Sequence, residues 1–144
     1  MLKKIPKILT SDLIKILMDM GHGNEICIAN ANFPAVDYAK RIVNVGTDSI
    51  PKLLKNVLEY MPLDIAVENP VFLMEPLEPN WSYPQIWGEY STIVNKSDEA
   101  KAFHDFMLLE RFDFYERSKA CFAIVLTNEQ TIYSNVILKK GVIL

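Results

Sequence analysis

His22 is the residue whose type and setting best fit proton transfer. It lies between two glycines in the segment Gly21-His-Gly-Asn-Glu25, after an expected helix and before an expected buried strand. Glycines on both sides let the backbone turn sharply and let a ligand approach. An imidazole can both give and take a proton near neutral pH. The alternative is a histidine that caps the preceding helix, and the residue types alone favour that alternative because capping is common.

Polar side chains that could bind hydroxyl groups occur where strands are expected to end. Asn30 closes the first expected strand, and ligands of α/β sheets gather beyond the carboxyl ends of strands. Arg111, a fork of five donors, lies where an expected strand meets a helix. Tyr133 and Asn135 would project to one face of an expected strand. The structural alternatives are an Asx turn for Asn30 and a half-solvated edge strand for the last two.

The remaining titratable side chains give weaker signals. Asp64 is either a turn residue at the entry to a strand or a carboxylate in a pocket. His104 lies in a charged run and is expected to be a solvated helix residue. Cys27 and Cys121 lie in apolar runs, which favours buried free thiols over a disulfide. Two histidines without Cys-x-x-Cys or His-Glu-x-x-His spacing predict no metal site.

Composition limits the classes of partner. Half of the 144 residues are hydrophobic and 23% are charged, which excludes a disordered chain. Fifteen basic and eighteen acidic side chains give a net charge of −3 without a basic patch, so we expect no nucleic-acid partner. The longest clean apolar run, residues 120–126, is too short to cross a membrane, and no cleavable signal is visible. The expected compartment is the cytoplasm.

The elements that must position these residues alternate between helix and strand. The segment Thr10-Ser11-Asp12 is expected to cap a first helix that ends near Gly21. A second helix is expected to begin near Asp48 or Ser49, with Pro51 in its first turn. Further helices are expected over residues 86–94, 97–106 and 112–119. Strands are expected over residues 26–29, 65–67, 71–74, 107–109, 122–126 and 132–138, and residues 75–84 are expected to form an ordered loop. This alternation predicts one layered α/β domain over residues 1–144.

Six segments, in order from the first residues to the last, resemble one known family. They are Lys3-x-Ile5-Pro-x-Ile8-Leu, Met20-Gly-His-Gly-x-Glu25-Ile, Asn32-Phe-Pro-Ala35, Pro62-Leu-Asp64, Arg111-Phe-x-Phe-Tyr-Glu-Arg117 and Tyr133-x-Asn-x-Ile-Leu-Lys-Lys-Gly141. The family comprises the fucose mutarotases and D-ribose pyranases. The resemblance implies an α/β fold with a mixed sheet covered by helices. It also implies interconversion of sugar anomers or ring forms without a cofactor, a metal or net redox change.

The resemblance also implies roles for particular residues. His22 matches the acid/base histidine of the family, and the expected sugar-binding positions are Arg111, Tyr133 and Asn135, with Asp64 and Met74 as further pocket positions. An arginine at position 111 resembles the fucose branch, since the ribose branch has a histidine there. Members assemble as dimers or decameric rings with pockets near subunit contacts, so a homo-oligomer acting on a free monosaccharide is expected.

Asn30 departs from the family pattern, which usually has an aspartate at this position. An amide can hydrogen-bond a hydroxyl group, but it cannot act as a base or balance the charge of an imidazolium. Three explanations stay open: His22 works with another carboxylate such as Asp64, the substrate preference has shifted, or activity is reduced. The leading expectation is an L-fucose mutarotase. The alternatives are a D-ribose pyranase and a non-catalytic monosaccharide-binding protein.

Overall fold

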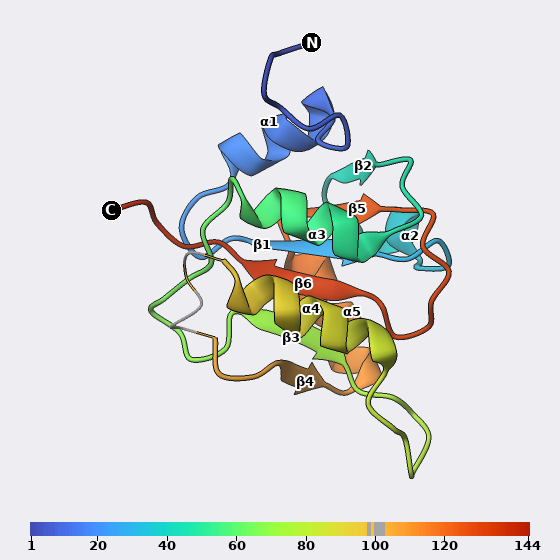
Figure 1. The fold of residues 1–144 in the computed structure, drawn as a ribbon. Helices are drawn as coiled ribbons and strands as arrows, with labels where there is room; N and C mark the ends of the chain where they lie inside the picture. The colour runs from blue at the N-terminus through green and yellow to red at the C-terminus, as the bar shows by residue number, and fades with distance from the viewer. Residues whose placement is uncertain (98, 100–102) are drawn as a thin grey trace.

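A mixed β-sheet with helices on both faces forms the centre of the molecule (Figure 1), as expected from the sequence. The computed structural model describes residues 1–97, 99 and 103–144. The helices are α1 (Ser11–Asp19), α2 (Ala35–Tyr38), α3 (Ile50–Leu58), α4 (Gln85–Asn95) and α5 (Arg111–Ala120). The strands are β1 (Glu25–Ala29), β2 (Ile42–Asn44), β3 (Val71–Met74), β4 (Met107–Leu109), β5 (Ala123–Leu126) and β6 (Val136–Lys139).

The order of the strands is β2-β5-β1-β6-β3-β4. β1 is parallel to β5, β5 to β2 and β3 to β4, whereas β6 runs antiparallel to both β1 and β3. The two last strands of the chain therefore lie on either side of β1 instead of pairing with each other. The carboxyl ends of β1, β3, β4 and β5 share one end of the sheet with the start of β6.

The central strands are buried on both faces, which explains their continuous apolar sequences. In β1, Ile26 and Ile28 pack with α1, α3 and α4, while Cys27 packs on the opposite face with Phe114 of α5. Ile137 of β6 is the cross-strand partner of Cys27 and packs on the same second face. Figure 1 shows α3 and α4 in front of the sheet and α5 behind it. Both faces of the sheet are therefore covered, and the loops at its two ends reach the surface.

Local sequence sets the starts of the main helices. The Thr10 side chain accepts a hydrogen bond from Leu13 N, which confirms the predicted cap of α1. The Ser49 side chain accepts one from Lys52 N, so Ser49 is the cap of α3, one of the two predicted starts. Glu110 caps α5 by accepting from the N–H groups of its first turn. Among the helices of the described residues, none is long and apolar enough to cross a membrane.

The structure corrects three sequence expectations and adds two elements. Residues 65–67 are a turn instead of a strand, because the Asp64 carboxylate accepts Ala66 N–H at 2.9 Å. The last strand begins at Val136 instead of 132, because Tyr133 adopts a left-handed φ of +58°. α2 and β2 were not expected. Residues 98 and 100–102 of the helix expected over 97–106 lie outside the described residues, and residues 103–106 are not helical.

Candidate active site

His22 lies in a tight turn between the end of α1 and the start of β1. Gly23 makes the turn possible, because its φ of +81° lies in the left-handed region that other residues rarely adopt. The Asn24 side chain closes the turn by accepting Gly21 N–H at 2.8 Å. The His22 side chain is 52% exposed, so dissolved molecules can reach the imidazole.

Asp64 is the partner of His22. The imidazole Nε2 lies 3.3 Å from Asp64 Oδ1, and the Asp64 side chain is 95% buried, with 5% exposed. The same oxygen accepts Ala66 N–H, which fixes the carboxylate in place. Asp64 is therefore a turn residue whose carboxylate also lies beside the histidine, and its place in a sugar-binding pocket stays a prediction. Pairing of Nε2 leaves Nδ1 for a substrate, and no described residue hydrogen-bonds Nδ1.

The end of β6 holds both members of this pair. Lys140 donates its N–H to Asn24 O and accepts Gly23 N–H, both at 2.8 Å, which secures the histidine turn. Lys139 O accepts Asp64 N–H at 3.0 Å, and Gly141 N–H donates to Pro62 O at 2.9 Å. Three consecutive residues thus connect two segments that are 42 residues apart in the chain.

Gly141 has a specific reason to be glycine at this junction. A Cβ atom added there would lie 2.3 Å from Leu63 O and 2.9 Å from Asp64 Cα. These contacts are too short for any side chain, since the atoms involved belong to the backbone. The close approach of Gly141 is what allows Asp64 to lie beside the end of β6.

Asn30 and Asn135 meet at the other end of the sheet. Asn30 N–H donates to Asn135 Oδ1 at 2.8 Å, and both residues are buried. The Asn30 amide donates to Thr131 O at 3.3 Å and accepts Asn32 N–H at 3.1 Å. The side chain of Asn30 therefore forms the Asx turn that the sequence left as an alternative. Its contact with a sugar stays a prediction.

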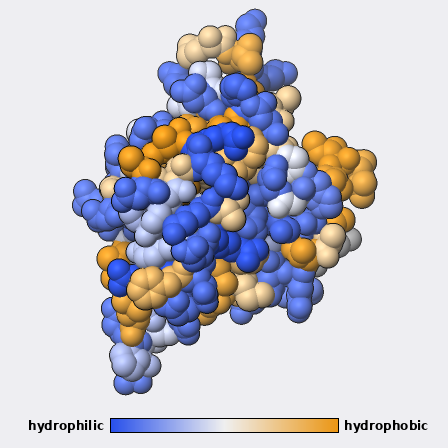
Figure 2. All heavy atoms as spheres, turned by 180° about the vertical axis from the view of Figure 1, so that it is seen from behind, coloured by the Kyte–Doolittle hydropathy of each residue, from blue (hydrophilic) through white to orange (hydrophobic). Residues whose placement is uncertain are grey.

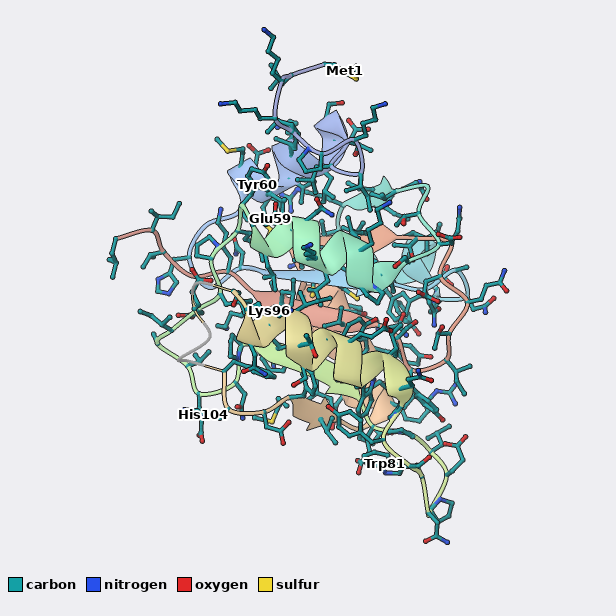
Figure 3. The ribbon with its side chains drawn as sticks, in the orientation of Figure 1. Met1, Glu59, Tyr60, Trp81, Lys96 and His104 are labelled. Carbon is teal, nitrogen blue, oxygen red and sulfur yellow. The ribbon has the colours of Figure 1, made fainter. Side chains whose placement is uncertain are left out.

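Tyr133 is fixed by the loop of residues 75–84. Its hydroxyl donates to Glu78 Oε2 at 2.8 Å and accepts Leu77 N–H at 3.1 Å, while its carbonyl accepts the Trp87 indole N–H at 2.8 Å. These bonds offset the cost of the left-handed backbone. A cavity of about 440 Å³ lies beside Tyr133 and is also lined by Glu78 and Trp81. Figure 3 shows Trp81 on this loop, far from Tyr60 at the other end of the molecule.

Arg111 and Met74 lie on the same end of the sheet as Tyr133. Arg111 is the first residue of α5, directly after β4, as expected from the sequence. Its guanidinium lies 5.6 Å from the ring centre of Phe112 and 5.7 Å from that of Tyr115. Met74 ends β3, is buried, and pairs in register with Leu109. Five of the seven predicted site residues therefore gather at the carboxyl ends of the strands.

The predicted site residues divide into two groups at opposite ends of the sheet. His22 and Asp64 lie beside the start of β1 and the end of β6, which is the end that carries the C-terminus in Figure 1. Asn30, Tyr133 and Asn135 lie beyond the other end of these strands. The five residues of β1 alone span about 13 Å. One monosaccharide cannot contact both groups of a single chain.

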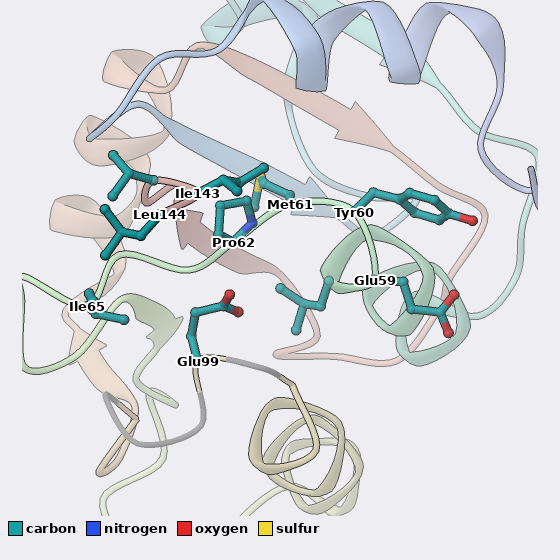
Figure 4. A pocket seen from close by; sticks show the side chains of 10 residues that line it. Glu59, Tyr60, Met61, Pro62, Ile65, Glu99, Ile143 and Leu144 are labelled. Carbon is teal, nitrogen blue, oxygen red and sulfur yellow. The ribbon is translucent and has the colours of Figure 1, made fainter.

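A cavity of about 640 Å³ lies beside the chain segment that contains Asp64 (Figure 4). Its walls include Pro62 and Ile65, which flank Asp64, and the C-terminal residues Ile143 and Leu144. Ile65 is 56% exposed and Ile143 is 85% exposed. This end of the molecule thus combines an acid/base pair with an apolar surface.

Burial and hydrogen bonds shift the pKa values of three groups outside the His22–Asp64 pair. Burial raises the pKa of the Cys27 thiol, and burial, aided by Glu25, raises that of Cys121 to about 12. Both cysteines are free, as expected. Burial raises the pKa of Glu129, but hydrogen bonds from Thr131, Ile50 and Gln130 outweigh it and hold that pKa below its ordinary value.

Sequence reasoning missed two residues that touch the predicted site. Glu78 bonds the Tyr133 hydroxyl, but it lies in a loop whose path has no sequence signal. Lys140 is part of the Lys-Lys-Gly141 motif, but the motif alone indicates no role for its side chain. His104 is exposed and points away from the sheet in Figure 3, in a segment that is not helical.

The chain is similar in sequence and in fold to proteins of known name. A mouse protein named fucose mutarotase is 43% identical to the chain, with coverage of 97% of this chain and 94% of the mouse protein. The crystal structure of the fucose mutarotase from Streptococcus pneumoniae in complex with L-fucose is 41% identical and has a TM-score of 0.89, with coverage of 99% and 100%.

Bacillus subtilis RbsD complexed with D-ribose is 24% identical over 98% of this chain and 99% of its own, with a TM-score of 0.74, and shares the fold. Residues 3–143 match the model of the RbsD / FucU transport protein family. The chain belongs to this family.

Proposed function

We propose that the protein is an L-fucose mutarotase, which interconverts the α and β anomers of the free sugar. The observation that carries this proposal is the contact between the exposed imidazole of His22 and the buried carboxylate of Asp64. An imidazole held by a fixed carboxylate on one nitrogen presents the other nitrogen in a defined direction. The arginine at position 111 and the named fucose mutarotase relatives support fucose over ribose.

The proposed chemistry is opening and closing of the pyranose ring. A proton leaves the anomeric hydroxyl, the bond from the anomeric carbon to the ring oxygen breaks, and the ring oxygen takes up a proton. The aldehyde then rotates about its bond to the next carbon, and the ring closes on the other face. His22 Nδ1 takes the proton from the anomeric hydroxyl and gives it to the ring oxygen of the sugar, while Asp64 keeps the imidazole oriented. Acid/base catalysis of this kind contributes about 10²–10⁴-fold.

A complete site requires two copies of the chain. The groups proposed to bind the sugar hydroxyls, Arg111, Tyr133 and Asn135, lie at the opposite end of the sheet from His22. We therefore propose that the His22 end of one copy faces the Tyr133 end of another. Repeated head-to-tail contacts can close into a ring, and a two-fold dimer can satisfy the same pairing twice.

Exposed apolar side chains at both ends support this assembly. At the His22 end they are Ile65, Ile143 and Leu144, and Figure 2 shows the hydrophobic surface of the C-terminal residues at that end. At the Tyr133 end they are Leu77, Tyr83 and Ile132. Apolar surface of this kind on a compact domain marks interaction sites.

Mixing two inactive variants tests the shared site. His22→Ala and Asn135→Ala are each expected to slow anomer exchange. After mixing and reassembly, about one quarter of the sites should contain both intact groups, because each site draws them from two randomly chosen copies. Recovery of about one quarter of the wild-type rate supports the proposal. Mixed oligomers without recovery would place both groups in sites of a single chain.

The central test of activity is NMR exchange between the α and β anomers of L-fucose and of D-ribose. We expect the protein to accelerate fucose exchange more than ribose exchange, and His22→Ala to remove the acceleration. Faster exchange of ribose would select the D-ribose pyranase alternative. Equal exchange by wild type and His22→Ala would remove His22 from the mechanism.

A non-catalytic monosaccharide-binding protein is the second candidate, and Asn30 favours it. The amide of Asn30 is engaged with Thr131 and Asn32, and it cannot act as a base. Fucose binding without accelerated exchange in the wild type, with exchange gained by Asn30→Asp, would select this candidate.

The two free, buried thiols support our further proposal that the protein works in the cytoplasm.

A further inference from the structure

We propose that the Lys140 side chain is a positioning residue for the His22–Asp64 pair. The inference rests on the proposed function, because it concerns the same histidine. It assigns a role to an ammonium group that touches neither the imidazole nor the sugar-binding end of the chain. Lys140 acts by fixing the end of the helix from which the His22 turn starts.

The Lys140 ammonium caps the C-terminal end of α1, a role that the residue types alone favour for His22. Its Nζ donates to Leu17 O at 2.8 Å and to Met20 O at 2.6 Å, the carbonyl groups left free at the end of α1. α1 has no basic residue in its own last turn. A cation at this position satisfies the free carbonyls and interacts favourably with the helix dipole. His22 is consequently not needed as a cap, and its ring is available to pair with Asp64.

The backbone of Lys140 completes the arrangement. The same residue donates its N–H to Asn24 O and accepts Gly23 N–H, so its backbone holds the chain directly after His22. Its neighbours Lys139 and Gly141 hold the Asp64 segment. The side chain fixes the chain before His22, since its bonds to Leu17 O and Met20 O tie the start of the turn to the end of β6, which also holds the Asp64 segment. A turn fixed at one side only could swing the imidazole away from the carboxylate.

Lys139 provides a matched control. It is the adjacent lysine, but its ammonium lies 3.7 Å from Glu25, a carboxylate that Arg117 already binds through two nitrogens at 2.7–3.2 Å. Lys139→Met therefore removes the same charge from the same strand and leaves the His22 turn intact. We expect anomer exchange by this variant to equal that of the wild type.

The test is a double-mutant cycle on the full oligomer, with L-fucose exchange as the readout. Lys140→Met is expected to lower kcat about 10–100-fold with little change in KM, because misplacement of a catalytic group by about 1 Å can cost this much. Asp64→Asn should also lower kcat. If Lys140 acts through the pair, the double variant should be no slower than the slower single variant.

Three outcomes would overturn the inference: multiplication of the two losses in the cycle, wild-type kcat in Lys140→Met, or an equal loss in Lys139→Met. A separate readout is amide hydrogen exchange of residues 21–24, which should accelerate in Lys140→Met and not in Lys139→Met. If Lys140→Met does not fold, the cycle is run with Lys140→Gln. His22→Ala is measured in parallel: wild-type exchange in that variant refutes the proposed function, whereas a slow His22→Ala with a fast Lys140→Met refutes only the role of Lys140.

Discussion

Replacement of Gly141 by alanine is expected to separate Asp64 from His22 without touching either side chain. The added methyl group would lie 2.3 Å from Leu63 O, 2.8 Å from Leu63 C and 2.9 Å from Asp64 Cα. Since ordinary contacts begin at 3.4 Å, the backbone of the Leu63–Asp64 segment must move by about 1 Å. The contact from His22 Nε2 to Asp64 Oδ1 is already 3.3 Å, so a shift of this size away from the turn breaks it.

Two magnitudes follow from this displacement. Overpacking of this kind costs about 1–3 kcal/mol of folding free energy, which for a chain of this length lowers Tm by about 2–4 °C per kcal/mol. A misplacement of about 1 Å at a catalytic group lowers the rate by about 10²-fold. We therefore expect Gly141→Ala to remain folded at room temperature but to lose most of its acceleration of fucose anomer exchange.

The assay is NMR exchange of L-fucose anomers at a temperature well below the Tm of each variant, measured by circular dichroism. Gly88→Ala is the control, because apart from its chain neighbours and the backbone of its own helix no described atom lies within 4 Å of the added methyl group on the exposed side of α4. It should keep wild-type exchange and be about 1 kcal/mol more stable, since alanine favours a helix. Wild-type exchange by Gly141→Ala would refute the reasoning that Asp64 must stay in place.

Three further predictions concern other parts of the molecule. Tyr133→Phe removes the hydrogen bonds of the hydroxyl to Glu78 and Leu77. It should raise KM for fucose several-fold, measured by exchange at varied fucose concentration, and lower the free energy of unfolding by about 1 kcal/mol, measured by thermal unfolding. Glu129 has a lowered pKa, so its stabilisation is present above its ordinary value of 4.5 and is lost as the pH falls through the folded-state value. Glu129→Gln should therefore lower Tm at neutral pH and reduce the further fall of Tm in acid. Cys27 and Cys121 should not react with a thiol reagent in the native protein and should both react in denaturant, because burial raises the pKa of both thiols.

The elements that sequence predicted well are those with strong local signals. Thr10 and Ser49 cap helices through their own side chains, and the apolar residues 26–29 form a strand covered on both faces. Elements decided by distant contacts were predicted less well. Tyr133 leaves the strand pattern because residues 77, 78 and 87 bond it, and no local signal specifies those partners. α2 and β2 are too short, at four and three residues, for periodicity to identify them.

The candidate site shows the same limit. Sequence placed His22 at a helix end and Arg111 between a strand and a helix, and both placements are confirmed. Asp64 was one of several possible carboxylates, and only the folded chain brings it to His22. The division of the predicted residues between two ends of the sheet depends on the strand order. That order is a tertiary property, because β6 lies between β1 and β3 only after the whole chain has been made.

The central position of β1 has a consequence for biosynthesis. Both hydrogen-bonding edges of this early strand are completed by β5 and β6, and the bonded residues Asn30 and Asn135 are 105 positions apart. While the ribosome is still elongating the chain, β1 keeps an apolar, unpaired backbone until the last few dozen residues have emerged. Nascent chains with such unpaired edges aggregate readily and fold slowly. Loss of the last ten residues would remove β6 and therefore prevent the sheet from closing at its middle.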